Sequence, residues 1–476
     1  MDCKLRAKNC GGCPMLATEY AAQLKKKEAD VRALLGKYGP VSPIRGMETP
    51  YHYRNKVIST FAPAAGGKLT SGIYAARTHK VLPVESCLLQ DEVLDKVMLA
   101  VRAAANACRY QPFNEDKGTG LLRHCLLRRG VATGQVMVVL VTAQPVLPGA
   151  KNFVKALLAE AEKRGVPVTT VVQNYNPRRT SVVLGEDEKV LYGKGFILDT
   201  LCGKTYALSP RSFYQVNPVQ TAVLYGLAVD AAHLTGKEVV LDAYCGIGTI
   251  GLTASDKARQ VVGVEVNRDA VRDAIGNAKH NGVKNARFFA ADATAWIREA
   301  ADAGQKADVV FMDPPREGST PAFVESVARM APKRIVYVSC NPETMARDLA
   351  LLTQKVYRAE GFTPVDMFPH SAHCETVCLL SKLNVKHHIE VEITMDELDL
   401  TAAESKATYD EIKAYVLEKF GFKVSQLYIA QIKRKCGIIE RKNYNQSKKE
   451  DAKVPKCPPE KEAAIMDALK HFQMIP

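Results

Sequence analysis

A cysteine at the end of a predicted strand is the residue of this sequence best placed for covalent chemistry. Residues 336–338 form a short β-branched and aromatic run typical of a buried strand, and Ser339, Cys340, Asn341 and Pro342 follow it directly. Pro342 disfavours helical dihedrals at Asn341, so we expect the strand to end there. Ligands of open α/β sheets bind at such strand ends. Cys340 is therefore a candidate nucleophile; a buried structural cysteine is the alternative.

Charged side chains lie next to the two neighbouring predicted strands. Asp313 and Arg316 belong to the run Asp-Pro-Pro-Arg-Glu-Gly that follows one strand, and Glu375 ends the run His-Ser-Ala-His-Cys-Glu that precedes the other. The two prolines keep the chain extended after Asp313. A thiolate can act as a nucleophile and a carboxylate as a general base. We therefore expect Cys340 and Glu375 on neighbouring strand ends, with Arg316 helping to lower the pKa of the thiol.

A glycine-rich turn predicts a second chemical site. Residues 239–241 read as a strand, and the run Asp-Ala-Tyr-Cys-Gly-Ile-Gly-Thr-Ile-Gly begins directly after it, with glycines at Gly246, Gly248 and Gly251. Strand, glycine turn and helix open a doubly wound sheet, and the glycines admit a ligand against the backbone at the helix N-terminus. Glu265 ends the next predicted strand, nineteen residues after Gly246, where a carboxylate can bind ribose hydroxyls.

Two ligands compete for this turn. The glycine spacing matches the dinucleotide fingerprint, so an NAD-dependent dehydrogenase is one interpretation. Asp242 and Cys245 beside the first glycine are instead typical of S-adenosylmethionine sites, and the sheet ends carry no evident hydride-handling His or Tyr. Asp292, after the predicted strand 286–289, is placed either to approach an adenine or to lie in an ordinary surface turn.

The N-terminus carries a cysteine pattern of its own. Cys3, Cys10 and Cys13 fall within the first thirteen residues, and Cys87 is the nearest candidate for a fourth thiolate. Four thiolates suit zinc or an iron–sulfur cluster, and three close cysteines with one distant one favour a 4Fe-4S cluster. The alternative is a set of reduced cysteines in a frayed terminus.

Composition favours a polyanionic partner. The chain has 476 residues and a formal net charge of +14, and residues 117–180 carry ten Lys or Arg against two Asp or Glu. Such a surface attracts phosphate backbones, so we interpret 117–180 as a nucleic-acid platform. Its Arg128, Arg129, Arg178 and Arg179 are expected in turns. No apolar run is long enough for a membrane span and no signal region is seen, which predicts a cytoplasmic protein with reduced cysteines.

The remaining elements read as helices and strands around these sites. A helix is expected at 18–37 with Thr18 as its cap, and its run of three lysines from Lys25 can touch phosphate or form a solvated face. Aromatic and basic residues interleave at 51–56, which suits stacking on bases or an ordinary half-exposed strand. Further elements are expected at 57–61, 136–142, 150–164, 168–172, 219–233, 260–264, 307–312, 321–330, 342–352 and 376–381.

Taken together, these motifs resemble the bacterial RNA uracil-5 methyltransferases, and most closely the iron–sulfur-containing enzymes acting on 23S ribosomal RNA. The likeness includes the run Phe-Tyr-Gln-Val-Asn at 213–217 and spans residues 1 to about 383. It implies a Rossmann-like class I methyltransferase domain, an N-terminal and central α+β RNA-binding region, and a 4Fe-4S cluster. It also implies Cys340 as nucleophile and Glu375 as base. The residues implied to contact S-adenosylmethionine are Gln215, Tyr244, Glu265 and Asp313.

The resemblance sets the expected domain boundaries. We expect an iron–sulfur segment at 1–90, a central RNA-binding region at 91–204, a methyltransferase domain at 205–383 and a basic helical extension at 384–476. The small β-barrel that many relatives carry before the first cysteine is expected to be absent, because Cys3 is nearly terminal. The extension predicts helices at 408–420, 424–434 and 459–472, either as a helix-turn-helix RNA-binding module or as a bundle packed on the core.

The resulting functional prediction is methylation of carbon 5 of a uridine in 23S ribosomal RNA by a monomeric, S-adenosylmethionine-dependent enzyme. Two alternatives stay open. One is a transfer-RNA uracil-5 methyltransferase, because composition does not distinguish the two RNAs. The other is a non-catalytic RNA-binding iron–sulfur sensor, against which the intact Cys340 and Glu375 argue.

Overall fold

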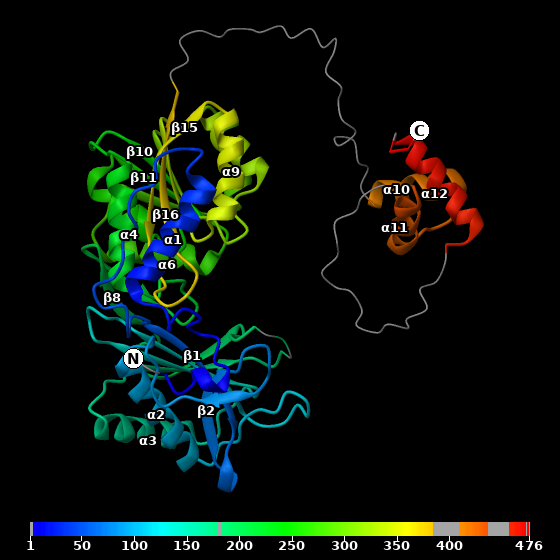
Figure 1. Cartoon of the computed structure of the whole chain (residues 1–476). Helices are drawn as coiled ribbons and strands as arrows, with labels where there is room; N and C mark the ends of the chain where they lie inside the picture. The colour runs from blue at the N-terminus through cyan, green and yellow to red at the C-terminus, as the bar shows by residue number, and fades with distance from the viewer. Residues whose placement is uncertain are drawn as a thin grey trace. The chain divides into compact units, whose positions relative to one another are not determined.

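The computed structural model describes residues 3–178, 180, 182–383, 409–436, 457–472 and 474–475. The chain divides into two compact units, Met1–Lys386 and His387–Pro476 (Figure 1). Within these described ranges, no helix is both long enough and apolar enough to cross a lipid bilayer.

A seven-stranded sheet forms the centre of the second half of the first unit. Its strand order is β12-β11-β10-β13-β14-β16-β15, and the five strands from β12 to β14 run parallel, whereas β16 lies antiparallel between β14 and β15. This is the predicted Rossmann-like sheet. The strands are β10 (Val239–Ala243), β11 (Gln260–Glu265), β12 (Ala286–Ala290), β13 (Val309–Met312), β14 (Arg334–Ser339), β15 (Tyr357–Val365) and β16 (Glu375–Lys382).

Helices cover both faces of this sheet, because its strands are apolar on both sides. Val240 and Phe311 pack into one core, whereas Leu241 and Val310, their neighbours in sequence, pack into the other. Strands buried on two faces read as continuous apolar runs, which is how they appeared in the sequence. The helices are α4 (Pro218–Ala231), α5 (Thr249–Ala254), α6 (Arg268–His280), α7 (Ala293–Asp302), α8 (Pro321–Met330) and α9 (Pro342–Gln354).

The strand order places the candidate site. β10 is followed in space by β11 on one side and by β13 on the other, so the chain direction across the sheet reverses at β10. Ligands of open α/β sheets bind outside the carboxyl ends of the strands at such a switch point. Tyr244, Asp313 and Cys340 each follow the carboxyl end of a strand, and Glu265 ends β11. The topology therefore brings these four residues to one edge.

A second seven-stranded sheet occupies the first half of the unit. Its order is β3-β2-β1-β4-β5-β6-β7, and α2 (Glu92–Ala107) and α3 (Ala150–Lys163) pack on one face (Figure 1). The hairpin of β8 (Ile197–Leu201) and β9 (Lys204–Leu208) joins the core of the other sheet. The strands of the second sheet are β1 (Lys56–Pro63), β2 (Leu69–Tyr74), β3 (Val81–Pro83), β4 (Leu122–Arg129), β5 (Val136–Thr142), β6 (Thr170–Tyr175) and β7 (Asp187–Tyr192).

The expected boundary at residue 90 falls inside this sheet, because strands from both sides of it pair with one another: β1 pairs with β4. Residues before β1 contact both sheets: the carbonyl of Asn9 accepts from the amide of Ala76, just after β2, at 2.9 Å. α1 (Tyr20–Leu35) places Val31 and Leu35 in the core of the catalytic sheet, and the segment after it bridges to the outer strand β15. Covering an edge strand in this way satisfies backbone groups that would otherwise be exposed. The segment 1–90 thus packs partly on the sheet of β1 to β7 and partly on the sheet of β10 to β16.

Two details of the basic regions differ from the predictions. α1 begins at Tyr20, with Glu19 rather than Thr18 at the capping position. Arg128 does not lie in a turn on a basic surface: it is part of β4, is 2% exposed, and donates to the carbonyls of Ser209 at 3.0 Å and Ser212 at 2.7 Å. β4 is not predicted from the sequence, because charged arginines interrupt the apolar pattern of this strand.

The described residues of the second unit form a cluster of three helices. α10 (Tyr409–Phe420), α11 (Gln426–Lys435) and α12 (Pro459–His471) confirm the helices predicted there. Their apolar faces share one small core that includes Ile412, Ile429 and Ile465. Residues 384–408 and 437–456 of the expected basic extension lie outside the described residues.

A buried ion pair joins α1 to the loop before β16. The Nζ atom of Lys27 lies 2.6 Å from Oδ1 of Asp366, with side chains 1% and 0% exposed. The hydroxyl of Tyr20 donates to the other oxygen of Asp366 at 2.9 Å, and Lys27 also donates to the carbonyl of Phe368 at 3.1 Å. One lysine of the predicted charge run is therefore structural, because its charge is fully enclosed.

Replacing Lys27 with Met should strongly destabilise the first unit, because it leaves the Asp366 carboxylate buried without its cation. Breaking one partner of a buried pair costs about 3–5 kcal/mol. The free energy of unfolding can be followed by the fluorescence of Trp296, the single tryptophan. Lys26→Met is the matched control, because Lys26 pairs with Asp30 at the surface, where loss costs about 0–1 kcal/mol. Equal losses of unfolding free energy in Lys27→Met and Lys26→Met would contradict the structural role of Lys27.

Candidate active site

The turn after β10 is built as a ligand cradle. Tyr244, Gly246 and Gly248 have φ values of 64°, 54° and 83°, which fold the chain back before α5. The buried carboxylate of Asp242 accepts from the amide of Gly251 at 2.8 Å and so ties the strand to the helix. Burial raises the pKa of Asp242 to about 7. The first turn of α5 thus faces the sheet edge in a fixed position.

Glu265 closes the other side of the cradle. Its two carboxylate oxygens accept from the amides of Gly246 at 3.1 Å and Asn267 at 2.8 Å. A carboxylate has about four lone-pair sites, so both oxygens keep capacity for ribose hydroxyls. A Cβ atom added to Gly246 would meet no atom within 4 Å, which shows open space above the turn. These residues fit S-adenosylmethionine.

Three further predicted contacts lie around this cradle. Tyr244 packs against Phe323 with ring centroids 5.0 Å apart, and the pKa of its phenol is raised to about 12, mainly by burial. Asp292 is exposed and caps α7 by accepting from the amide of Ala295 at 2.9 Å. Gln215 is buried and lines a neighbouring cavity. The roles of these three residues toward a ligand stay predictions.

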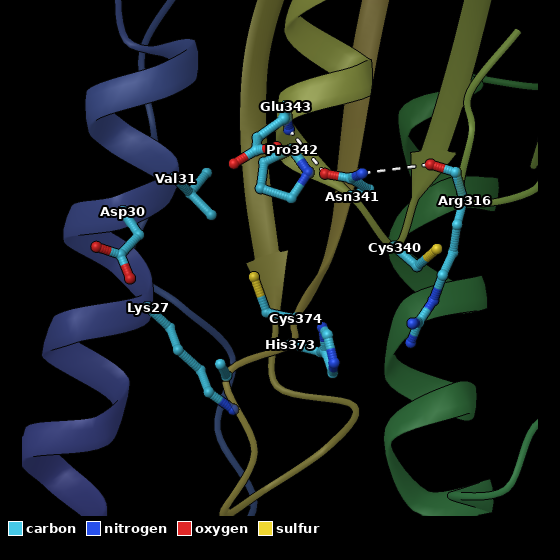
Figure 2. A pocket seen from close by; sticks show the side chains of 11 residues that line it. Lys27, Asp30, Val31, Arg316, Cys340, Asn341, Pro342, Glu343, His373 and Cys374 are labelled. Carbon is cyan, nitrogen blue, oxygen red and sulfur yellow. Dashed lines mark hydrogen bonds between the residues drawn. The ribbon is translucent and has the colours of Figure 1, made fainter. Parts of the chain in front are cut away.

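The predicted nucleophile and base lie on paired strands. Cys340 follows β14 directly, Glu375 begins β16, and the residues beside them, Ser339 and Thr376, are register partners. Asn341 caps α9 by accepting from the amide of Glu343 at 3.0 Å, which ends the strand as the sequence predicted. The same Asn341 donates to the carbonyl of Arg316 at 3.3 Å (Figure 2). The tip of β14 is thereby tied to the loop after β13.

The electrostatics of Cys340 differ from the sequence prediction. The pKa of its thiol is raised to about 11, first by burial and then by the charges of Glu375 and Asp313, while Arg316 lowers it. Burial and Asp313 also raise the pKa of Glu375 to about 8, and burial raises that of Asp313 to about 7. The expected lowering of the thiol pKa is therefore wrong for the protein alone, because burial first, and then the two acids, outweigh the guanidinium of Arg316.

Two connected cavities open around these groups. The first, of about 260 Å³, is lined by Cys340, Arg316, His373 and Lys27 (Figure 2). The second, of about 520 Å³, shares Arg316 and His373 with the first. The other side chains that matter for the second cavity are Arg54, Lys56, Phe213 and Gln215. A cleft thus leads from the thiol past Arg316 and His373 to the exposed ring of Phe213.

A clamp that the sequence did not reveal holds the loop before Glu375. The side chain of Gln23 accepts from the amide of His370 at 3.0 Å and lies 3.1 Å from its ring nitrogen Nδ1. The carbonyl of His370 accepts from Met15 at 3.0 Å, and the ring of His370 stacks on Tyr51. Gln23 and His370 are 347 residues apart, so no local pattern signals the pair. The segment after Cys13 thus touches the catalytic loop.

The four N-terminal thiols come together electrostatically. The pKa of Cys13 is raised to about 11, by burial and then by Cys87, Cys10 and Cys3, so all three of the other thiols act on Cys13. The amide of Leu89 donates to the sulfur of Cys87 at 3.5 Å. In the part of the chain that the structure describes, no three His, Cys, Asp or Glu side chains are grouped as metal ligands. A cluster is therefore not shown.

Sequence and structure comparisons agree on one kind of protein. A family model described as tRNA (Uracil-5-)-methyltransferase matches residues 183–383. Uncharacterized RNA methyltransferases of Halalkalibacterium halodurans and Clostridium tetani are each 41% identical to this chain, over 79% and 78% of it and 82% and 81% of their own lengths. The crystal structure of Pyrococcus abyssi tRNA (uracil-54, C5)-methyltransferase with S-adenosyl-L-homocysteine has a TM-score of 0.64 at 28% identity, covering 78% of this chain and 86% of that one.

The charges around Cys340 predict how fast its thiol is alkylated. Glu375→Gln should lower the thiol pKa, because it removes a charge that raises it, and Arg316→Gln should raise the pKa. The rate of iodoacetamide labelling at Cys340 can be followed by mass spectrometry as a function of pH. Its pH profile should shift to lower pH in Glu375→Gln and to higher pH in Arg316→Gln. Glu343→Gln is the control, because Glu343 lines the same cavity without acting on the thiol. Unchanged profiles in all three variants would contradict the assigned electrostatics.

Proposed function

This chain belongs to the bacterial RNA uracil-5 methyltransferase family, and from that premise we propose that it methylates a uridine of 23S ribosomal RNA through a covalent bond to Cys340. It is an S-adenosylmethionine-dependent RNA methyltransferase, as its relatives and structural neighbour indicate. The single observation that carries the proposal is the juxtaposition of Cys340, Glu375 and Asp313 at the edge that also holds the cradle of Glu265.

The chemistry of uracil explains why a thiol is needed. Carbon 5 of the ring is a poor nucleophile, and addition of a thiolate to carbon 6 converts the ring into an enolate that is reactive at carbon 5. S-adenosylmethionine supplies a methyl group on a positively charged sulfur. Cys340 forms the bond to carbon 6, and it must lose its proton to do so. The carboxyls of Glu375 and Asp313, whose charges act on this thiol, are the acceptors that we propose for that proton.

Glu375 completes the reaction. After methylation, carbon 5 carries both a proton and a methyl group, and a positioned base must remove that proton. Glu375 takes the proton from carbon 5, the electrons of that bond restore the ring double bond, and the thiolate of Cys340 leaves carbon 6. The proton that Cys340 first gave up returns to its sulfur. The carbon-5 proton passes from Glu375 to solvent, which balances the reaction.

The cleft beside the thiol suits a nucleotide that has left its stack. An enzyme that acts on a base inside folded RNA must extrude it. Phe213 is 65% exposed at this cleft, and aromatic rings of this kind stack on unpaired bases. Burial and the charges of Arg128 and Arg54 lower the pKa of Lys56 to about 8, so a neighbouring phosphate would stabilise its charged form. These side chains support RNA entry at this end.

The N-terminal thiols support an iron–sulfur cluster, which we include in the proposal. Cys3, Cys10, Cys13 and Cys87 are the residues that would hold it, and metal binding would stabilise their thiolates in spite of the raised pKa of Cys13. The cysteine pattern is also what supports ribosomal RNA as substrate, by resemblance. Because Met15 bonds to the loop of Glu375, the thiol segment also supports the active site mechanically.

A transfer RNA is the second candidate substrate. It is favoured by the likeness to the Pyrococcus abyssi enzyme, whose name specifies uracil 54 of tRNA. The same covalent chemistry applies to either RNA, so one experiment separates the substrates and tests the chemistry.

RNA transcribed with 5-fluorouridine should trap the enzyme, because fluorine at carbon 5 leaves no proton for Glu375 to remove. We expect a stable adduct with 23S RNA and S-adenosylmethionine, resolved by denaturing gel and mapped to Cys340. Cys340→Ala should abolish it, and Glu375→Gln should accumulate an adduct even with ordinary uridine RNA. Cys108→Ala is a matched control, because Cys108 is a half-buried thiol distant in sequence. Trapping of transfer RNA alone would support the second substrate, and no trapping would refute the nucleophile.

Anaerobically purified protein should contain about four iron and four sulfide per chain, as a 4Fe-4S cluster requires. Cys87→Ser should lose most of the iron and the visible absorption of the cluster, because it removes one of four ligands. Cys108→Ser should retain both. Zinc without sulfide, or unchanged iron in Cys87→Ser, would contradict this assignment.

A further inference from the structure

A hollow lined by both polar and apolar side chains opens on the sheet of β1 to β7, separate from the cleft at Cys340. Its volume is about 690 Å³, and a smaller cavity adjoins it and shares its central residues. The residues common to both, called the hollow from here on, are Thr60, Tyr74, His79, Glu115, Asp116 and His124. None of these residues has a part in the chemistry described above.

The hollow lies on the same strand face as the active-site cleft. Along β1, Val57 and Ser59 are buried, whereas Lys56, Ile58 and Thr60 alternate with them on the open face. Lys56 lines the cleft, and Ile58 and Thr60 line the hollow. Four residues of strand span about 13 Å. An RNA strand whose target base enters the cleft can therefore run along this face and reach the hollow.

The side chains of the hollow are arranged to meet a flat polar ring. Tyr74 is 39% exposed, and the ring of His79 stands nearly perpendicular to it with centroids 6.1 Å apart. The hydroxyl of Thr60 lies 3.1 Å from Nδ1 of His124, a residue only 7% exposed. Burial and the charge of Arg123 lower the pKa of His124 to about 4, so its ring is neutral at neutral pH. The ring of His124 therefore offers no cation to a phosphate.

A buried arginine beside the hollow has an unused donor. Arg123 is 2% exposed and lines the adjoining cavity, and its Nε atom is buried without a hydrogen-bond partner. It is the extra residue of an irregularity in the pairing of β4 with β5. Bulges of this kind redirect side chains and recur next to binding sites. Arg123 also lies 3.5 Å from the carboxylate of Glu115 and 5.1 Å from the ring centroid of Phe113.

The charge of the hollow selects the ligand. Glu115 and Asp116 are exposed carboxylates at its rim, in a region that is otherwise basic. Carboxylates repel phosphate but accept hydrogen bonds from amino groups on base edges, as Glu and Asp do from the amino group of cytosine. Uracil has no exocyclic amino group. Arg77 and Lys80, exposed beside the rim, are available for the backbone phosphates.

We propose that the hollow binds an unpaired, amino-bearing base of the substrate RNA, on the same strand as the target uridine and a few nucleotides from it. The base stacks on Tyr74 and presents its amino group to Asp116 and Glu115. This rests on the proposed function and deepens it, because it gives the enzyme a second base to read. Recognition would then depend on two unpaired positions held at a fixed separation.

The test measures binding of short single-stranded RNA to the full chain. The reference is a fluorescein-labelled oligouridylate nonamer with a central 5-fluorouridine, and the probes carry one adenosine, cytidine or guanosine at each flanking position. We expect at least one amino-bearing base at one offset to tighten the dissociation constant about tenfold, within the range known for stacked bases. If guanosine is the base that tightens binding, inosine at the same position should not tighten it, because inosine lacks the amino group of guanosine. Equal affinity for all probes would overturn the proposal.

Two variants test whether the hollow is the cause of the gain in affinity. Asp116→Asn and Tyr74→Ser should each remove most of the gain, measured for each variant as the ratio of its affinity for the probe to its affinity for oligouridylate. Glu162→Gln, an exposed acid on α3, is the matched control and should keep it. A gain that persists in Asp116→Asn and Tyr74→Ser would overturn the assignment. The proposed function is tested separately by the Cys340 adduct on fluorinated 23S RNA. If the unsubstituted protein forms no adduct, the proposed function fails. The variants in the hollow should still form this adduct.

Discussion

Three acidic groups, the thiol of Cys340 and the carboxyls of Glu375 and Asp313, share one poorly solvated edge of a parallel sheet. Burial raises the pKa of all three, Asp313 also raises that of Glu375, both carboxyls raise that of Cys340, and Arg316 lowers the pKa of Cys340 and of Glu375. At neutral pH this keeps the thiol protonated and leaves the carboxyl pair partly protonated. A protein at rest therefore holds an unreactive sulfur beside groups that can exchange its proton. A site of this kind becomes nucleophilic only when positive charge or a substrate changes the balance.

The rest of the first unit serves to keep that edge fixed. The loop that ends in Glu375 has few regular hydrogen bonds of its own, and α1 supplies them through Gln23, while Lys27 and Tyr20 hold Asp366 at the base of the loop. Because a buried ion pair is costly to break, the N-terminal helix and the catalytic loop should move together. This links the thiol segment of Cys13 to the catalytic carboxylate through packed structure.

The surface that we propose to bind RNA has two regions of different charge, the cleft at Cys340 and the hollow. Arg54, Lys56 and Arg316 line the cleft, where the proposed function places the target nucleotide and its phosphates. The hollow around Asp116 is acidic, which disfavours phosphate and favours the edge of a base. The net charge of +14 conceals this division, and some of the arginines that contribute to it, such as Arg128, are buried among carbonyls.

The sequence by itself determined the catalytic sheet and the strand ends that carry Cys340, Asp313 and Glu265, because apolar runs, glycine turns and prolines act through local backbone preferences. It also predicted the three helices of the second unit. Only the tertiary structure decided the pKa of Cys340, the burial of Arg128 in β4, and the pairing of Gln23 with His370. These depend on which distant segments approach one another and on how much water they exclude, and neither quantity is a property of a short stretch of chain.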